Sequence, residues 1–159
     1  MLPTLSEVSR LELAKQRVAY ISAKKQQGEL NMDPVDWIQK NFYIPELKGP
    51  IQLLPYQQIV LRHVLTKDAD GFFPFSTIVW SDVKKSIKSC IAAAVGLWIA
   101  YVTDWASVIC IANDLKGADS RVGYYMRRAI ELNPVLKASS KVRNYRIELP
   151  NKSFIESVA

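Results

Sequence analysis

The spacing of apolar residues near the start of the chain predicts helices. Thr4 and Glu7 fit a capping box, and apolar residues then recur at helical spacing until Gly28. This pattern is typical of an amphipathic amino-terminal helix. Asp33 as the cap and Pro34 in the first turn predict a second, shorter helix.

The middle of the chain reads as a strand, a polar loop and a buried helix. Three prolines and one glycine between residues 43 and 55 predict an extended connector, which leads into a helix over residues 56–65. The β-branched and aromatic run Ser76–Trp80 has the length of a buried strand. A polar stretch over residues 81–89 separates it from an alanine-rich segment at 91–101, which predicts a buried helix.

The last third of the chain predicts one more buried strand, a helix and a hairpin. Residues 106–112 form the strand, and the pair Asn113–Asp114 can cap a helix that ends at Asn133. Residues 143–149 and 153–158 alternate like the two strands of a hairpin. This alternation of strands and helices predicts an α/β fold with a mostly parallel sheet, covered by helices on both faces.

Composition narrows the class of protein. The 159 residues suffice for one domain but not for two enzymatic domains. A hydrophobic share of 49% with 23% charged residues favours a folded protein over a disordered one. Lysine and arginine exceed aspartate and glutamate by 21 to 15, a net charge of +6 that fits either a phosphate-bearing partner or a solvated basic face.

The cysteines and the apolar segments bear on the compartment. Cys90 and Cys110 both lie in apolar runs, where thiols usually pack as small hydrophobic side chains, and this favours a reducing cytoplasm. The longest apolar stretch, residues 91–102, is shorter than the roughly 20 residues that span a bilayer. We therefore expect no membrane insertion.

The polar stretch before the alanine-rich helix occupies the position of a phosphate-binding loop of the type G-x-x-x-x-G-K-[ST]. In such loops backbone amides at a helix start face the phosphates, a lysine neutralises their charge, and the next hydroxyl coordinates magnesium. Lys88 and Ser89 have the right types and positions for the last two roles. Lys84 and Lys85 add positive charge to the loop.

Both glycines of this loop pattern are replaced. Asp82 stands at the first glycine position, and Ile87 stands at the second, immediately before the lysine. A β-branched residue resists the positive φ that glycine adopts there. The local pattern thus leaves two interpretations open, a nucleotide loop or a lysine-rich helix start at a solvated edge.

Several motifs in the same order resemble the amino-terminal ATPase region of phage large terminase subunits, from about Asp33 to Ala159. The matching segments are Asp36–Pro45, Ile51–Gln58, Val83–Ser89, Ser107–Asp114 and Ile130–Leu136. The resemblance implies part of a P-loop NTPase of the RecA-like (ASCE) type, a three-layer α/β fold. In it, residues 1–50 would be a helical extension and residues 51–159 the front part of the ATPase domain.

The same resemblance implies a site for ATP and Mg²⁺ at the loop. Lys88 would neutralise charge on the β- and γ-phosphates, and Ser89 would ligate Mg²⁺. Either Lys84 or Lys85 would act near the γ-phosphate. The other loop residues implied to contact the nucleotide are Asp82, Val83, Ser86 and Ile87.

The adenine side of the implied site is the Ile51–Gln58 motif. Tyr56 would flank the base, and Gln57 would hydrogen-bond its edge, because an amide donates and accepts at once. Without the resemblance, Tyr56 and Gln57 also fit a helix start that exposes polar side chains.

The activity implied by the resemblance is an ATP-hydrolysing motor that translocates double-stranded DNA into capsids in the host cell cytoplasm. Its partners would be a portal protein, a small terminase subunit and further copies of the chain in a homo-oligomer. The family's acidic strand end follows the hairpin, beyond Ala159, and its nuclease lies further on, so this chain alone is not expected to hydrolyse ATP. The alternative, favoured by Ile87, is a decayed nucleotide fold that serves as a DNA-contact or assembly module.

Other conspicuous side chains have simpler interpretations. We interpret His63 as a surface or packing residue rather than a ligand. Four aromatic residues are predicted to pack in the core: Trp98, Trp105, Tyr124 and Tyr125. Six basic residues fit either DNA phosphate contacts or a solvated face: Arg127, Arg128, Lys137, Lys141, Arg143 and Arg146.

Overall fold

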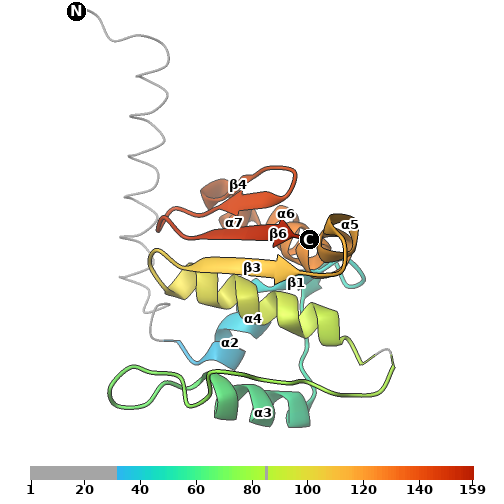
Figure 1. Cartoon of the computed structure of the whole chain (residues 1–159). Coiled ribbons are helices and arrows are strands. Elements are labelled where there is room, and N and C mark those ends of the chain that lie inside the picture. Colours follow the sequence, from blue (N-terminus) through green and yellow to red (C-terminus); the bar gives the residue numbers. More distant parts are fainter. Residues whose placement is uncertain (1–31, 85) are drawn as a thin grey trace, which may run out of the picture.

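A computed structural model describes residues 32–84 and 86–159, which form a small mixed α/β protein (Figure 1). The helix predicted from Thr4 to Gly28 lies outside these residues. The described helices are α2 (Pro34–Asn41), α3 (Pro55–Leu65), α4 (Lys88–Val102), α5 (Leu115–Ala118), the π-helical turn η2 (Asp119–Gly123), α6 (Tyr124–Leu132) and α7 (Pro134–Ser139). The strands are β1 (Tyr43–Ile44), β2 (Gly49–Pro50), β3 (Ser107–Ile111), β4 (Lys141–Val142), β5 (Arg146–Glu148) and β6 (Phe154–Val158). No helix among them is long and apolar enough to cross a bilayer.

The main sheet is mixed, not mostly parallel as predicted. Its strand order is β3-β6-β5-β4, and only β3 and β6 run parallel. The β5–β6 pair forms the predicted antiparallel hairpin, and β4 extends it. The short strands β1 and β2 pair separately inside the predicted connector.

One face of the main sheet is open in the described part of the chain, so the predicted cover on both faces is wrong there. Side chains alternate along β3, and Cys110 faces the interior with 8% exposure. Ile109 and Ile111 point the other way and are 43% and 73% exposed. In Figure 1, α6 and α7 lie behind the sheet, on its covered face.

The predicted strand Ser76–Trp80 does not form. The segment is extended but belongs to no sheet, and Ile78 and Val79 are 47% and 87% exposed. Figure 1 shows it running along the α3 side of α4, whereas β3 lies on the other side of that helix. Strand preference is chiefly a preference for packing beside other strands. No described strand lies next to this segment, so its composition alone does not produce a strand.

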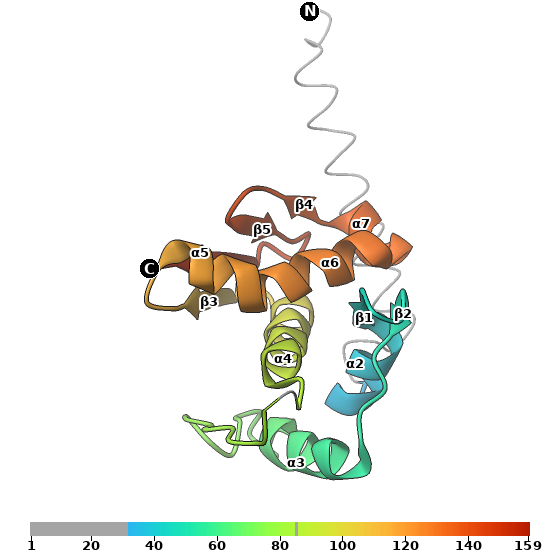
Figure 2. The same cartoon turned by 90° about the vertical axis from the view of Figure 1, so that its right-hand side faces the viewer.

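Helix α4 is the centre of the fold, as the alanine-rich pattern predicted. Figure 2 shows it between the sheet and α6 above and α3 below. Its Ala93, Leu97 and Ala100 are fully buried. Gly96 lets α6 approach α4 closely, because a Cβ at position 96 would lie 2.5 Å from Cε of Met126 on α6. Burial of apolar surface from several sides fixes this helix in place.

The carboxy-terminal end of α4 is tied to the hairpin turn. The Asn151 side-chain amide donates to the carbonyls of Ala100 and Thr103, at 2.8 and 2.9 Å. The buried Ser153 hydroxyl donates to the same Thr103 carbonyl at 2.7 Å. Carbonyls in the last turn of a helix have no partner within the helix. The hairpin therefore satisfies them and sets the sheet against α4.

Two of three capping side chains confirm predictions from the sequence, and the third begins a helix that was not predicted. Asp33 accepts hydrogen bonds from the amides at the start of α2, and Asp114 accepts one at the start of α5. Asn133 was predicted to end a helix, and α6 does end there. Asn133 then caps α7, which was not predicted, while its Nδ2 donates to the Asn41 carbonyl at 2.9 Å. Polar groups at the end of α2 and at the start of α7 are thereby paired inside the core.

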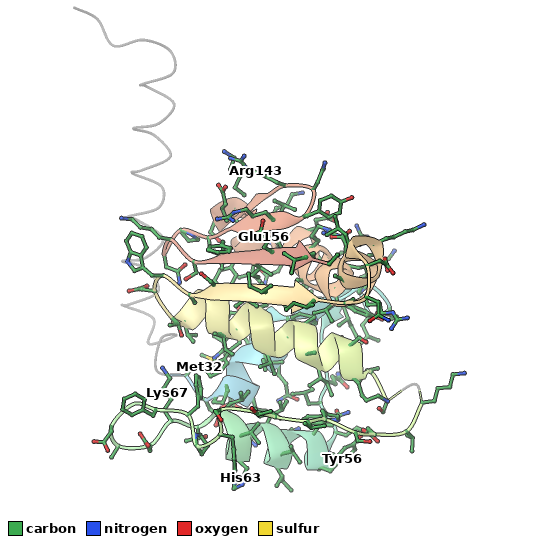
Figure 3. All side chains as sticks on the ribbon, viewed as in Figure 1. Met32, Tyr56, His63, Lys67, Arg143 and Glu156 are labelled. Atoms are coloured by element: carbon green, nitrogen blue, oxygen red, sulfur yellow. The ribbon has the colours of Figure 1, made fainter. Side chains whose placement is uncertain are left out.

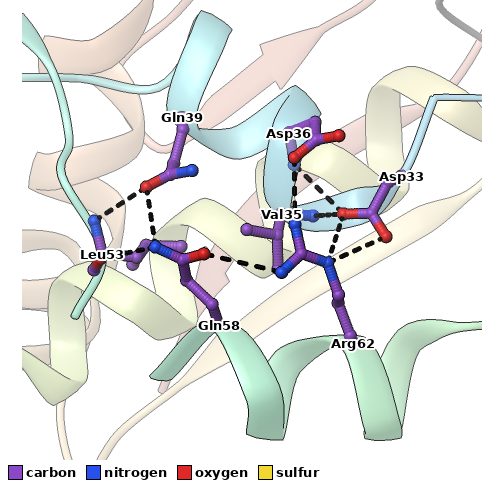
Figure 4. A network of polar contacts seen from close by, with 7 residues as sticks. All are labelled: Asp33, Val35, Asp36, Gln39, Leu53, Gln58 and Arg62. Atoms are coloured by element: carbon purple, nitrogen blue, oxygen red, sulfur yellow. Dashed lines mark hydrogen bonds and ion pairs between the residues drawn. The ribbon is translucent and has the colours of Figure 1, made fainter. Parts of the chain in front are cut away.

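A polar network fixes α3 against α2 (Figure 4). The Arg62 guanidinium donates to both carboxylate oxygens of Asp33 at 3.2 Å and to Asp36 at 3.0 Å. One turn earlier on α3, Gln58 donates to the Leu53 carbonyl at 2.9 Å. The network therefore holds the helix whose first turn carries the predicted adenine-side residues.

We predict that Asn151→Ala lowers the free energy of unfolding by about 1–3 kcal/mol, because helix carbonyls lose their donor. Asn151→Asp has nearly the same shape but presents a carboxylate, which accepts and cannot donate at neutral pH. It should destabilise at least as much as alanine. Urea unfolding of the three proteins measures this, and an aspartate variant as stable as the parent would contradict the capping role.

Candidate functional site

Lys88, the first residue of α4, closes the preceding loop on itself. Its Nζ donates to the carbonyl oxygens of Asp82 and Val83 at 2.8 and 2.7 Å. The Ser86 hydroxyl lies within 3.4 Å of the same ammonium. Asp82, Val83 and Ser86 thus surround the charge of Lys88.

The turn into α4 passes through Ile87 in the left-handed conformation, with φ 58° and ψ 23°. This is the backbone shape that glycine adopts readily and that a β-branched residue resists. The left-handed region costs roughly 1–2 kcal/mol for a residue with a Cβ. The loop therefore has the glycine-type turn even though isoleucine occupies it, and the Ile87 side chain is 42% exposed.

The amino-terminal end of α4 carries no side-chain cap. Ile87 is the N-cap residue and offers no acceptor. By contrast, Asp33, Asp114 and Asn133 accept hydrogen bonds from the first amides of α2, α5 and α7. The first turn of a helix leaves amide donors unpaired and places a partial positive charge there. In α4 these donors remain available to an external acceptor such as an anion.

Tyr56 and Asp82 connect α3 to the loop. The Tyr56 hydroxyl donates to Asp82 at 2.9 Å, and Gln57 Nε2 donates to the Tyr56 oxygen at 3.3 Å. The Val83 amide and then the Tyr56 hydroxyl hold the pKa of Asp82 below its usual value, so its carboxylate is ionised at neutral pH. The hydrogen bond to Asp82 raises the pKa of Tyr56.

Gln57 is buried and occupied within the protein. It is 1% exposed, and its Oε1 accepts from the Leu54 amide at 2.9 Å. Tyr56 is 45% exposed, and Figure 3 shows it at the start of α3. Gln57 thus orients Tyr56 and caps α3, while Tyr56 remains accessible to a ligand. The interpretation of both as exposed helix-start residues holds for Tyr56 alone.

Two clefts lie on either side of the loop. The first, about 300 Å³, is lined by Tyr56, Gln57, Val83, Lys84, Ser86 and Ile87, together with Gln52 and Leu54. The second, about 410 Å³, lies at the start of α4 and is lined partly by Ser86, Ile87, Lys88 and Ser89. The fold thus brings the adenine-side motif and the loop together, with Ser86 and Ile87 between the clefts.

The remaining predicted loop residues take distinct places. Lys84 is exposed and belongs to the cleft beside Tyr56. Ser89 is half-buried in the first turn of α4 and belongs to the second cleft. Lys85 lies outside the described residues. Within the described part, no group of three or more histidine, cysteine, aspartate or glutamate side chains could hold a metal ion.

Sequence reasoning missed the opposite wall of the second cleft. Ser120 and Arg121 from η2, with Tyr124 and Tyr125 at the start of α6, complete it. Tyr124, predicted to pack in the core, is 41% exposed. The wall contains a π-helical turn, and such turns often occur at functional sites. The spacing of apolar residues in the sequence does not reveal this turn.

The other interpreted side chains divide between core and surface. Trp98 is buried as predicted, whereas Trp105 is 69% exposed and was wrongly placed in the core. His63 is exposed on α3 and packs its ring against Phe75, as expected (Figure 3). Both cysteines are buried as predicted, and burial raises the pKa of Cys90 to about 12. Their thiols are therefore protonated at neutral pH.

Most of the predicted basic face is paired with acidic residues. Arg127 binds Asp119 and Arg128 binds Glu131. Arg143 and Arg146 bind carboxylates of the hairpin strands β5 and β6. These four guanidiniums therefore already have anionic partners within the protein.

Comparison with models of known protein families and with curated proteins gives no match.

The strained turn gives a test that reverses the usual ranking of two small residues. We predict that Ile87→Gly is more stable than Ile87→Ala by about 1 kcal/mol, because only glycine removes the left-handed strain. In an ordinary helix or strand, alanine would be the more stable of the two. Chemical denaturation measures the difference, and an alanine variant as stable as the glycine variant would show that Ile87 is not left-handed.

Proposed function

We propose that residues 82–89 bind the phosphates of ATP and that the chain is the ATPase portion of a DNA-packaging motor like those of phage large terminases. The observation that carries this proposal is the start of α4. There Lys88, a left-handed residue and an uncapped helix terminus converge beside a cleft of about 410 Å³. Helix amides and a lysine ammonium are the groups that bind phosphate in P-loop proteins.

The first cleft suits the base. Tyr56 offers an exposed aromatic ring, and the hydrogen bond from the Gln57 amide to its hydroxyl oxygen keeps it in place. Aromatic faces stack on any nucleobase, so this contact by itself does not select adenine. Because Gln57 is occupied by Leu54 and Tyr56, we assign it the role of positioning Tyr56 ahead of direct contact with the base edge.

Lys88 and Ser89 serve the phosphates. When a triphosphate binds, its oxygens replace the carbonyls of Asp82 and Val83 as acceptors for the Lys88 ammonium. The Ser89 hydroxyl, one residue on, would ligate Mg²⁺, which would neutralise charge on the phosphates. Lys84 or Lys85 adds charge near the γ-phosphate.

The wider assignment rests on the resemblance of the ordered motifs to large terminases. In that assignment ATP hydrolysis drives double-stranded DNA into a capsid, with the portal protein, the small terminase subunit and further copies of the chain as partners. The host cell cytoplasm is the site of this reaction. The acidic residue that completes the family's ATPase is not among those that line the two clefts.

Ile87 supports a second candidate, a decayed nucleotide fold that serves as a DNA-contact or assembly module. Its side chain lines both clefts and stands where the family has none. In this candidate the loop keeps its shape without binding a nucleotide. The two candidates differ in one measurable property, the affinity for ATP.

We predict that Lys88→Ala abolishes binding of a fluorescent ATP analogue, because among the described residues no other ammonium lies at the centre of the loop. Lys137→Ala, which removes an exposed lysine from α7, should leave the affinity unchanged. Fluorescence titration measures both, with circular dichroism as the check on folding. Equal affinity in the parent and the Lys88 variant would mean that the loop is misassigned.

We further predict that Ile87→Gly tightens binding of the same analogue, because glycine lets the backbone close around phosphate and removes a side chain from between the clefts. Ile87→Ala removes most of the side chain but keeps a Cβ that restricts the backbone, and should tighten binding less. Negligible binding by the parent and by Ile87→Gly alike would favour the decayed module.

A further inference from the structure

Arg121 stands in the π-helical turn η2, across the second cleft from Lys88. Its side chain is exposed and lines the cleft. The turn is held against the sheet, because a Cβ at Gly123 would lie 2.8 Å from the Ser157 hydroxyl oxygen on β6. The backbone that carries Arg121 therefore has a fixed position relative to the start of α4.

Arg121 differs from the other described arginines in its pairing. Arg62, Arg127, Arg128, Arg143 and Arg146 each bind a carboxylate, whereas the side chain of Arg121 forms no ion pair or hydrogen bond with another described residue. Asp119, the nearest acid in sequence, is held by both terminal nitrogens of Arg127. The Arg121 guanidinium thus keeps its donors for a group outside the described chain.

The charges of the second cleft favour an anion. Its lining contains Lys88, Arg121 and three serines, with no carboxylate. The nearby Glu46 carboxylate affects two residues of the cleft wall without lining the cleft. Burial is the main cause that raises the pKa values of Cys90 and Tyr125, and the charge of Glu46 is the second. A planar guanidinium binds phosphate oxygens in a bidentate manner, which an ammonium cannot do.

We propose that Arg121 binds the terminal phosphate of the nucleotide from the side opposite Lys88 and so distinguishes ATP from ADP. This inference rests on the proposed nucleotide site. The nucleotide then crosses the loop at Ser86 and Ile87, with its base beside Tyr56 and its phosphates between Lys88 and Arg121. The second cleft is within the size range of small-ligand sites.

The test compares fluorescent ATP and ADP analogues on the parent, Arg121→Ala and Arg121→Lys. We expect alanine to weaken ATP binding about tenfold, the loss of one charge-assisted contact, and to change ADP binding less than about twofold. Lysine should restore part of the ATP affinity. Arg143→Ala, which removes an arginine at the far end of the sheet (Figure 3), should change neither affinity.

A second probe separates the phosphate cleft from the base cleft. Inorganic tripolyphosphate should displace the ATP analogue from the parent, and about tenfold more should be needed on Arg121→Ala. If the parent binds ATP and the alanine variant keeps the same ATP-to-ADP ratio, the role of Arg121 is overturned and the nucleotide site stands. If neither the parent nor Ile87→Gly binds ATP, the proposed site and this role fall together.

Discussion

Burial of α4 is the constraint on which the rest of the structure depends. The helix packs against the sheet, α2 and α6, and its fully buried Ala93 and Leu97 leave no freedom to shift it without opening the core. The two ends of α4 differ in whether side chains pair their backbone groups. At the carboxy-terminal end Asn151 and Ser153 satisfy the carbonyls, whereas at the amino-terminal end no side chain receives the first amides. A rigid helix with one uncapped end holds its donors at a fixed point, which is what binding a phosphate without reorganisation requires.

Elements with strong local signals could be predicted from the sequence, and those that depend on distant neighbours could not. Asp33–Pro34 announces α2 because cap and first-turn residues act within four positions. The alanine-rich run announces α4, although its burial is supplied by the fold. Ser76–Trp80 has strand composition, but a strand needs a neighbouring strand, and in the described structure α4 separates this segment from β3.

The candidate site shows the same division. The loop was predicted because lysine and serine stand at the positions that the chemistry requires, and Tyr56 because its motif resembles the adenine-side motif of large terminases. Arg121 was missed because more than thirty residues separate it from Lys88 in sequence. Only the packing of η2 against β6 brings the two to one cleft. Its lack of an acidic partner is likewise visible only when the ion pairs of its neighbours are known.

Asp82 links the two halves of the site in a way that limits what binding can change. Its carboxylate accepts from Tyr56 and from the Val83 amide, while its carbonyl accepts from Lys88. A phosphate that captures the Lys88 ammonium breaks the carbonyl contact and leaves the carboxylate contacts intact. Because Arg62 also holds α3 against α2, we expect the base side of the proposed site to stay in place during this exchange. In the proposed binding step the rearrangement is therefore confined to the Lys88 side chain and the turn at Ile87, where the Cβ of isoleucine restricts the backbone.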